Sequence, residues 1–196
     1  MNLLQKRKVV LAVTGGISAF KSPELASRLI SEGAVVRAAM TRAAMRFITP
    51  LTFEVVTRNP VWTDPGRYGP VSGSAHEELA WWAEAVVVAP ATANIIAKMA
   101  AGLAEDFMSA FLLTLEAPAI ICPSMSEAML EHPAVKANLA RLEARGHRVV
   151  EPGPGHPACG WEDRGRLPDL NVIMEEVRCA LSWKDVGGLR LAATRG

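Results

Sequence analysis

The residues best suited to chemistry are His76 and the segment downstream of it. An imidazole can take up or release a proton near neutral pH, and a buried, β-branched run at residues 85–89 follows it and stops at Pro90. A short loop of small and polar residues, 91–94 with Thr92, Ala93 and Asn94, then leads into a helical pattern that begins at Ile95. The end of a strand followed by the start of a helix places backbone N–H groups and polar side chains at the carboxyl edge of a sheet, where open α/β folds bind ligands. The segment therefore predicts a ligand site with a histidine one short helix upstream.

A glycine turn near the start of the chain predicts a second part of the same site. Residues 8–13 have the pattern of a buried strand, and residues 19–32 that of a helix that Gly33 ends. Between them lie Gly15, Gly16 and Ile17, where glycines let backbone amides approach a phosphate. A tight strand-to-helix turn without a ligand would use the same glycines.

The remaining pattern alternates strands and helices. Thr41 directly follows a predicted strand at residues 34–40, and its hydroxyl either contacts a ligand or caps a helix at residues 43–47. The further elements expected are strands at 117–122 and 147–150 and helices through Met129, at 134–145 and at 170–181. This alternation predicts a single α/β domain with a Rossmann-like (flavodoxin-like), doubly wound parallel sheet.

The segment between residues 48 and 74 is less regular. Residues 52–56 fit either a helical turn or a short strand, and residues 59–74 form a loop long enough for a lid or a subunit contact. Trp62 and Tyr68 in this loop look exposed.

Composition excludes several classes of function. A net charge of +1 and a pI near 7.8 give no electrostatic footprint for nucleic acid. No apolar stretch reaches the length of a membrane span, and residues 1–8 lack the apolar core of a signal peptide, so a cytoplasmic protein without a membrane segment is expected. The three cysteines, Cys122, Cys159 and Cys179, lack metal-ligand spacing, which favours free thiols and no metal site.

Three of the predicted strand ends carry hydroxyl or amide groups, which suit a flat, phosphate-bearing cofactor. FMN fits better than NAD, because no acidic residue follows a complete glycine fingerprint at about 20 positions.

Five patches in order along residues 8–180 carry a family resemblance: TGGISAFKSPEL, MTRAAMRFITPLTFEVV, HEELAWWAEAVVVAPATANIIAKMAAGLAED, PSMSEAM and ACGWEDRGRL. Together they resemble the homo-oligomeric flavin-containing cysteine decarboxylases, most closely the phosphopantothenoylcysteine decarboxylases of coenzyme A biosynthesis. The resemblance implies a flavodoxin-like fold, a small cysteinyl substrate, and FMN bound between the subunits of a homotrimer or of a dodecamer built of trimers. Residues 1–182 would form the FMN-binding flavoprotein domain. The tail at 183–196 resembles the join to a ligase domain in bifunctional relatives, where a strand and a glycine loop begin.

The resemblance also implies roles for individual residues. His76 and Cys159 would be catalytic, the first assisting proton removal while the flavin oxidises the cysteinyl thiol, and the second supplying a proton after loss of carbon dioxide. The residues expected to bind FMN are Gly15, Gly16, Ile17, Thr41, Thr92, Ala93, Asn94, Ile95 and Ser124. Those expected to bind the substrate are Ser126, Met129, Ala158 and Gly160. Without the family, His76 would be a surface or capping residue and Cys159 an idle thiol.

Two positions depart from the family pattern. Ser126 stands where the family has the asparagine that grips the substrate carboxylate, and a serine offers one hydroxyl instead of an amide's two donors. Trp81 stands where a basic residue often holds the substrate phosphate. The alternatives left open are other redox chemistry on the same scaffold, either a flavin reductase or a prenyl-flavin-making transferase, and a flavin-binding subunit without catalysis.

Overall fold

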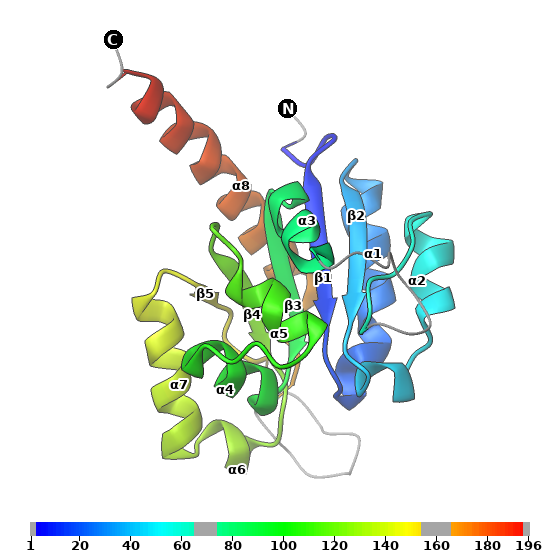
Figure 1. The fold of residues 1–196 in the computed structure, drawn as a ribbon, viewed down its shortest axis with the longest axis vertical. Coiled ribbons are helices and arrows are strands. Elements are labelled where there is room, and N and C mark those ends of the chain that lie inside the picture. Colours follow the sequence, from blue (N-terminus) through cyan, green and yellow to red (C-terminus); the bar gives the residue numbers. More distant parts are fainter. Residues whose placement is uncertain (1–2, 65–73, 154–165, 194–196) are drawn as a thin grey trace.

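The structure is a computed structural model that describes residues 3–64, 74–153 and 166–193, with side chains described as far as residue 182. Its centre is one five-stranded, all-parallel sheet (Figure 1). The strands are β1 (Lys8–Val13), β2 (Val35–Met40), β3 (Ala85–Ala91), β4 (Ala119–Pro123) and β5 (Arg148–Val149). Their order is β2-β1-β3-β4-β5, the flavodoxin-like order. The predicted fold class is confirmed.

Helices cover both faces of the sheet, which explains why the central strands show no polar alternation. On β1, Val9, Leu11 and Val13 belong to one buried cluster, whereas Val10 and Ala12 belong to another on the opposite face. Every residue of β3 and of β4 is buried. A strand of this kind needs apolar side chains in both directions, because each face packs against a helical layer.

The two helical layers can be followed in Figure 1. The first cluster packs side chains of α1 (Ser22–Ser31), α2 (Pro50–Thr57) and α8 (Leu170–Ala193) against the sheet. The second packs those of α3 (Ala75–Trp82), α4 (Ala93–Ala101), α5 (Phe107–Leu113) and α7 (Pro133–Ala144). The described residues also form three short helices: η1 (Ile17–Lys21), η2 (Ala44–Arg46) and α6 (Glu127–Leu130). Within the described residues, no helix has both the length and the apolar character needed to cross a bilayer.

Several local expectations need correction. Strand β3 does not stop at Pro90 but runs to Ala91, which pairs with Pro123 of β4 after a shift in register. Helix α5 has no counterpart in the sequence prediction, although Asp106 and Ser109 form a full capping box at its start. Helix α8 does not end at residue 181, and residues up to Ala193 are helical where the tail was expected to begin a strand.

The segment after residue 48 is also better defined than expected. Residues 50–57 form helix α2, so the short-strand alternative is wrong. Trp62 is not exposed: it is 5% accessible, it bridges to Ala39 beyond the edge of β2, and its ring stacks 6.1 Å from that of Phe107. Tyr68 lies outside the described residues.

Candidate functional site

The loops that follow β1 and β3 are tied together by the hydroxyl of Thr14. Thr14 is buried, and its Oγ1 donates to the carbonyl oxygen of Pro90 at 2.7 Å and accepts the backbone N–H of Thr92 at 3.1 Å. Strands β1 and β3 are neighbours whose connections leave the sheet in opposite directions, so this point is the topological switch of the fold. The hydroxyl therefore fixes both walls of the crevice in which such folds bind ligands.

The loop after β4 joins the same frame. The backbone N–H of Ser124 donates to the carbonyl oxygen of Ala91 at 3.0 Å, and the Oγ atoms of Ser124 and Ser18 lie 2.8 Å apart. Because β3 lies between β1 and β4, the pair of serines spans the end of the central strand. Three separate loops are thus held in a fixed relation at the carboxyl edge.

A cavity of about 800 Å³ opens at this edge. The predicted site residues that line it are Gly15, Gly16, Ile17, Thr41, Thr92, Ala93, Asn94, Ile95, Ser124, Ser126 and Met129. The structure therefore brings together the residues predicted from three strand ends and the glycine turn. Their individual binding roles stay predictions.

The two glycines of the turn differ in their surroundings. A Cβ on Gly15 would overlap the side chain of Ala43 and lie 2.8 Å from its carbonyl carbon, whereas a Cβ on Gly16 would make ordinary contacts with Thr92 Cγ2 at 3.6 Å and Pro90 Cγ at 4.0 Å. Gly16 has an extended conformation, with φ −135° and ψ 160°, and its N–H already donates to the carbonyl of Thr14. The tight packing against Ala43 is what requires a glycine at position 15.

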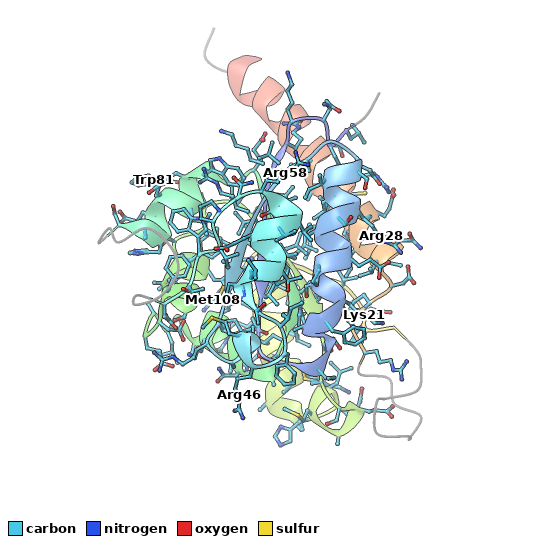
Figure 2. All side chains as sticks on the ribbon, turned by 90° about the vertical axis from the view of Figure 1, so that its right-hand side faces the viewer. Lys21, Arg28, Arg46, Arg58, Trp81 and Met108 are labelled. Atoms are coloured by element: carbon cyan, nitrogen blue, oxygen red, sulfur yellow. The ribbon has the colours of Figure 1, made fainter. Side chains whose placement is uncertain are left out.

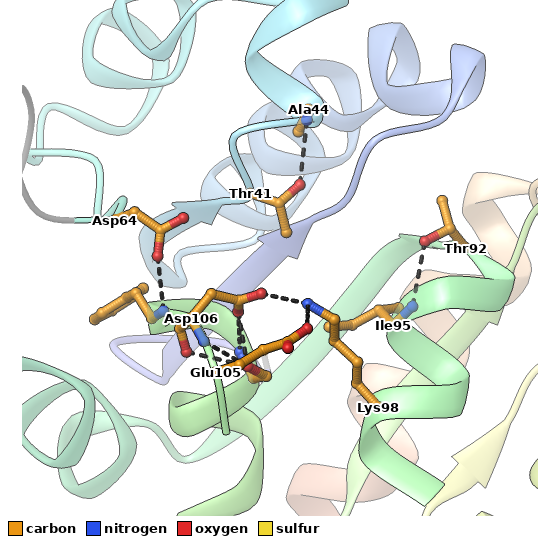
Figure 3. A network of polar contacts seen from close by, with 10 residues as sticks. Thr41, Ala44, Asp64, Thr92, Ile95, Lys98, Glu105 and Asp106 are labelled. Carbon is orange, nitrogen blue, oxygen red and sulfur yellow. Dashed lines mark hydrogen bonds and ion pairs between the residues drawn. The ribbon is translucent and has the colours of Figure 1, made fainter. Parts of the chain in front are cut away.

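A network of charged groups borders the cavity on the side of α4 and α5 (Figure 3). The ammonium of Lys98 lies 2.5 Å from Asp106 Oδ2 and 2.7 Å from Glu105 Oε1. Asp106 also caps α5 through Ser109, and Asp64 accepts the backbone N–H of Phe107 at 2.7 Å. Of these side chains, Asp64, Lys98 and Asp106 line the cavity.

The network keeps its members charged. Hydrogen bonds to Asp106 and Glu105 raise the pKa of Lys98. Burial alone would raise the pKa of Asp106, but hydrogen bonds from Lys98 and Ser109 outweigh it and lower the pKa below its ordinary value. Lys98 is thus a cation that carboxylates already neutralise, and not a candidate general base.

Other cations that line the cavity are Lys21, Arg42 and Arg166. Within the described part of the chain, neither Lys21 nor Arg42 forms an ion pair with a carboxylate. Cations without a carboxylate partner among the described residues, beside backbone N–H groups and hydroxyls, suit an anionic, phosphate-bearing ligand.

Four predicted site residues are not placed in the cavity. His76 lies in the first turn of α3, is half-buried, and does not line the cavity within a single chain. Cys159, Ala158 and Gly160 lie outside the described residues. Trp81, on the same helix as His76, is 70% exposed and projects away from the body of the domain in Figure 2.

The two described cysteines are free thiols. Cys122 lies in β4, where burial raises the pKa of its thiol, so the group stays protonated and unreactive. Among the described residues no group of histidine, cysteine and acidic side chains has the arrangement of a metal site.

Sequence reasoning missed several residues that line the cavity, among them Thr14, Ser18, Lys98 and Asp106. Thr14 could have been found by the rule that identified Thr41, because it too is a hydroxyl residue directly after a strand. Lys98 and Asp106 belong to different helices, and their pairing depends on how α4 and α5 pack, for which the sequence contains no signal.

An open parallel sheet in this order, with its cavity at the switch point, defines a doubly wound, ligand-binding α/β protein of flavodoxin-like class. The profile of the family described as Flavoprotein matches residues 2–182. The chain therefore belongs to the Flavoprotein family.

Similar proteins agree with this assignment. The chain is 42% identical to the coenzyme A biosynthesis bifunctional protein CoaBC of Bacillus subtilis over 88% of its length, and 42% identical to that of Escherichia coli over 98%. It spans only 43% and 48% of the length of these two relatives.

Solved structures of the same fold include cysteine decarboxylases. The FMN-dependent cysteine decarboxylase SpaF is 33% identical with a TM-score of 0.77, covering 92% of this chain and 98% of SpaF. A mutant PPC decarboxylase complexed with pantothenoylaminoethenethiol is 26% identical with a TM-score of 0.78, covering 92% of this chain and all of that chain.

Proposed function

We propose that this chain binds FMN and decarboxylates a cysteinyl substrate, converting 4′-phosphopantothenoylcysteine to 4′-phosphopantetheine in coenzyme A biosynthesis. The observation that supports this most is the cavity at the switch point between β1 and β3, lined by hydroxyl, amide and glycine residues of the loops that follow β1, β2, β3 and β4. The names of the curated relatives and of the solved neighbours support the same activity. We also propose a cytoplasmic location, where coenzyme A biosynthesis would use the protein.

The cavity fits FMN in size and in chemistry. A volume of about 800 Å³ lies within the range of cofactor sites, roughly 300–1,000 Å³. Gly16 leaves space in the cavity beside Thr92, because it has no Cβ to occupy it. The side chain of Asn94 is exposed at the cavity, and its amide can both donate to and accept from the heteroatoms of a flavin ring. Lys21 or Arg42 would neutralise the phosphate.

FMN would act as the two-electron oxidant of the substrate thiol. The protein's own contribution is to hold the reactants and to move protons. We propose that His76 takes up the thiol proton and that Cys159 returns a proton to the product. Since His76 does not line the cavity of its own chain, we further propose that a neighbouring copy provides it, in a homotrimer or a dodecamer of trimers with the site between subunits.

The direct test is to incubate the purified protein with 4′-phosphopantothenoylcysteine and to measure carbon dioxide and 4′-phosphopantetheine. Ser126→Asn is measured in parallel. An inactive wild type beside an active asparagine variant would show that the serine at position 126 is responsible for the loss of this activity. It would favour the alternative that the chain is a non-catalytic flavin-binding subunit. If both are silent while FMN is bound, the substrate assignment is wrong. A protein that cannot be loaded with FMN would contradict the whole proposal.

The shared site has a separate test. His76→Asn should remain yellow but lose turnover, and Gly15→Ala should lose flavin. Co-expressed with different affinity tags and purified as mixed oligomers, the two variants should regain turnover, because some interfaces then combine an intact cavity with an intact histidine. No recovery in verified mixed oligomers would contradict the shared site, and turnover by His76→Asn alone would remove the proposed role of His76.

A further inference from the structure

The charged groups that line the cavity are separated by sign between the two helical layers. Lys21, Arg42 and Arg166 come from η1, from the loop before η2 and from the segment before α8, and all three of these helices pack into the first buried cluster. The carboxylates of Asp64 and Asp106 accept backbone N–H groups of α5, which packs into the second cluster. The cavity therefore has a cationic side and, toward α4 and α5, an acidic side.

This separation of charge would orient a ligand that is anionic at one end. Carboxylates repel a phosphate, so the phosphate of FMN would lie on the cationic side and the uncharged flavin ring toward α4 and α5. Asn94, whose amide suits the heteroatoms of the ring, is on α4, and Lys98 follows it one helical turn later and also lines the cavity. The ring would therefore share its side of the cavity with the ammonium of Lys98.

Lys98 does not act on the cavity as an isolated cation. Its Nζ lies 2.5 Å from Asp106 Oδ2 and 2.7 Å from Glu105 Oε1 (Figure 3), so one ammonium and two carboxylates give the group a net charge of −1. The side chains of Lys98 and Asp106 are 13% and 27% exposed, whereas that of Glu105 is 64% exposed. Glu105 can therefore lose its charge with little effect on packing.

We propose that Glu105 and Asp106 lower the reduction potential of the bound flavin, because they cancel the positive charge that Lys98 would otherwise place beside the ring. This inference rests on the proposed function and gives a task to three residues that have none there. Two-electron reduction with uptake of one proton adds one negative charge to a flavin, so a nearby cation stabilises the reduced form and nearby carboxylates destabilise it.

A low potential suits a cofactor that must return its electrons in every turnover. In the proposed reaction the CH2–SH group of the substrate loses two electrons and two protons and becomes a thioaldehyde. The bond to the carboxylate then breaks, carbon dioxide leaves, and the electron pair of that bond forms the C=C bond of an enethiol, whose sulfur takes up one proton. The same two electrons, with two protons, finally saturate that C=C bond. An uncancelled cation beside the ring would hold the electrons on the cofactor and oppose this last step.

The test measures the reduction potential of the bound FMN by equilibration with redox dyes. Glu105→Gln removes a negative charge and keeps the shape of the side chain, whereas Lys98→Met removes the cation and keeps an unbranched side chain. The matched control is Glu175→Gln on α8. Glu175 is 65% exposed and lies 2.7 Å from Arg178, values close to those of Glu105 and Lys98, but Arg178 does not line the cavity.

The two charge changes should shift the potential in opposite directions. Glu105→Gln should tighten reduced relative to oxidised FMN roughly 2- to 5-fold, the range for an exposed ion pair, which raises the potential by about 10–20 mV. Lys98→Met leaves two carboxylates without their cation and should change the ratio roughly 10-fold the other way, which lowers the potential by about 30 mV. Asp106→Asn, a change at the cavity itself, should raise it more than Glu105→Gln, and Glu175→Gln should match wild type.

Opposite signs distinguish an electrostatic role from a structural one, because a loosened cavity would not reverse its effect with the sign of the lost charge. Unchanged potentials, or shifts in the same direction for Glu105→Gln and Lys98→Met, in proteins that retain FMN and wild-type thermal stability would overturn the inference and leave the proposed function standing. Should Lys98→Met fail to bind FMN, a potential that does not rise in Glu105→Gln and Asp106→Asn overturns it equally. A wild type that binds no FMN would refute the proposed function and the inference with it.

Discussion

Gly15 and Gly16 are adjacent and chemically identical, yet the structure predicts opposite results for the same substitution. In Gly15→Ala the new methyl group would overlap Ala43 and approach its carbonyl carbon to 2.8 Å. The obstacle is backbone, which no side-chain rotation can clear. Overpacking of this kind costs about 1–3 kcal/mol, which corresponds to a fall in Tm of roughly 2–12 °C for a chain of this size.

In Gly16→Ala the methyl group would contact Thr92 Cγ2 at an ordinary 3.6 Å, and the extended backbone of Gly16 accepts alanine without strain. The free energy of unfolding should therefore stay the same or rise by up to about 1 kcal/mol, because alanine restricts the unfolded chain.

The assay is thermal or urea unfolding of both variants as FMN-free protein, so that flavin contacts do not contribute. Flavin retention is measured separately: Gly15→Ala should lose FMN because Ala43 directly follows Thr41 and Arg42 on the cavity wall. Equal stability of the two variants, or a greater loss in Gly16→Ala, would refute the packing argument.

Three further outcomes are expected. Thr14→Val should lower the free energy of unfolding by about 1–3 kcal/mol, since it leaves the Pro90 carbonyl and a backbone N–H without their partner; Thr14→Ser should restore most of it. Burial, and then the charge of Arg145, lower the pKa of His147, whose Nδ1 accepts the N–H of Ala119. The free energy of unfolding should therefore fall as the pH drops below about 6.5, the pKa of a histidine in the unfolded chain. In urea unfolding at a series of pH values, His147→Gln should show a smaller fall below about pH 6.5 than the wild type. Asp106→Asn keeps an N-cap but loses the ion pair with Lys98. Because the pKa of Asp106 is lowered in the folded protein, its carboxylate should stabilise the wild type above about pH 4, and this stabilisation should disappear as the pH falls further. Urea unfolding at several pH values should show the variant less stable than the wild type above about pH 4 and the difference shrinking in acid.

The central strands could be predicted because β1, β3 and β4 contain apolar runs bounded by polar residues or proline. Strand β1 was predicted at its observed bounds, since Lys8 and Thr14 end the apolar run on either side. The prediction for β3 is too short because proline often ends a strand, whereas here the chain stays apolar and pairs again at Ala91.

The residues that the sequence could not reveal are those whose position depends on two elements packing together. Trp62 looked exposed because its neighbours in sequence are polar or proline-rich, but Phe107, 45 positions later, provides its partner. Helix α5 was missed because it is short and apolar on several sides, as a helix filling the space between α3 and α4 must be. Polar residues at strand ends can be recognised in the sequence, whereas residues that meet through helix packing can be identified only from the structure.

Some polar groups at the carboxyl edge hydrogen-bond to one another and hold the loops in place, whereas others are exposed at the cavity and could contact a ligand. Thr14 is committed to Pro90 and Thr92, and the oxygen of Thr92 accepts the N–H of Ile95. These groups hold the loops together, so little of their hydrogen-bonding capacity remains for a ligand. Among the other polar side chains that line the cavity, Asn94 and Ser126 are exposed, and they come from the loops after β3 and β4. Such a frame would position a flat ring, and because the side chain of Ser126 makes no hydrogen bond to α6, a change at this position can alter the rim of the cavity without disturbing the fold.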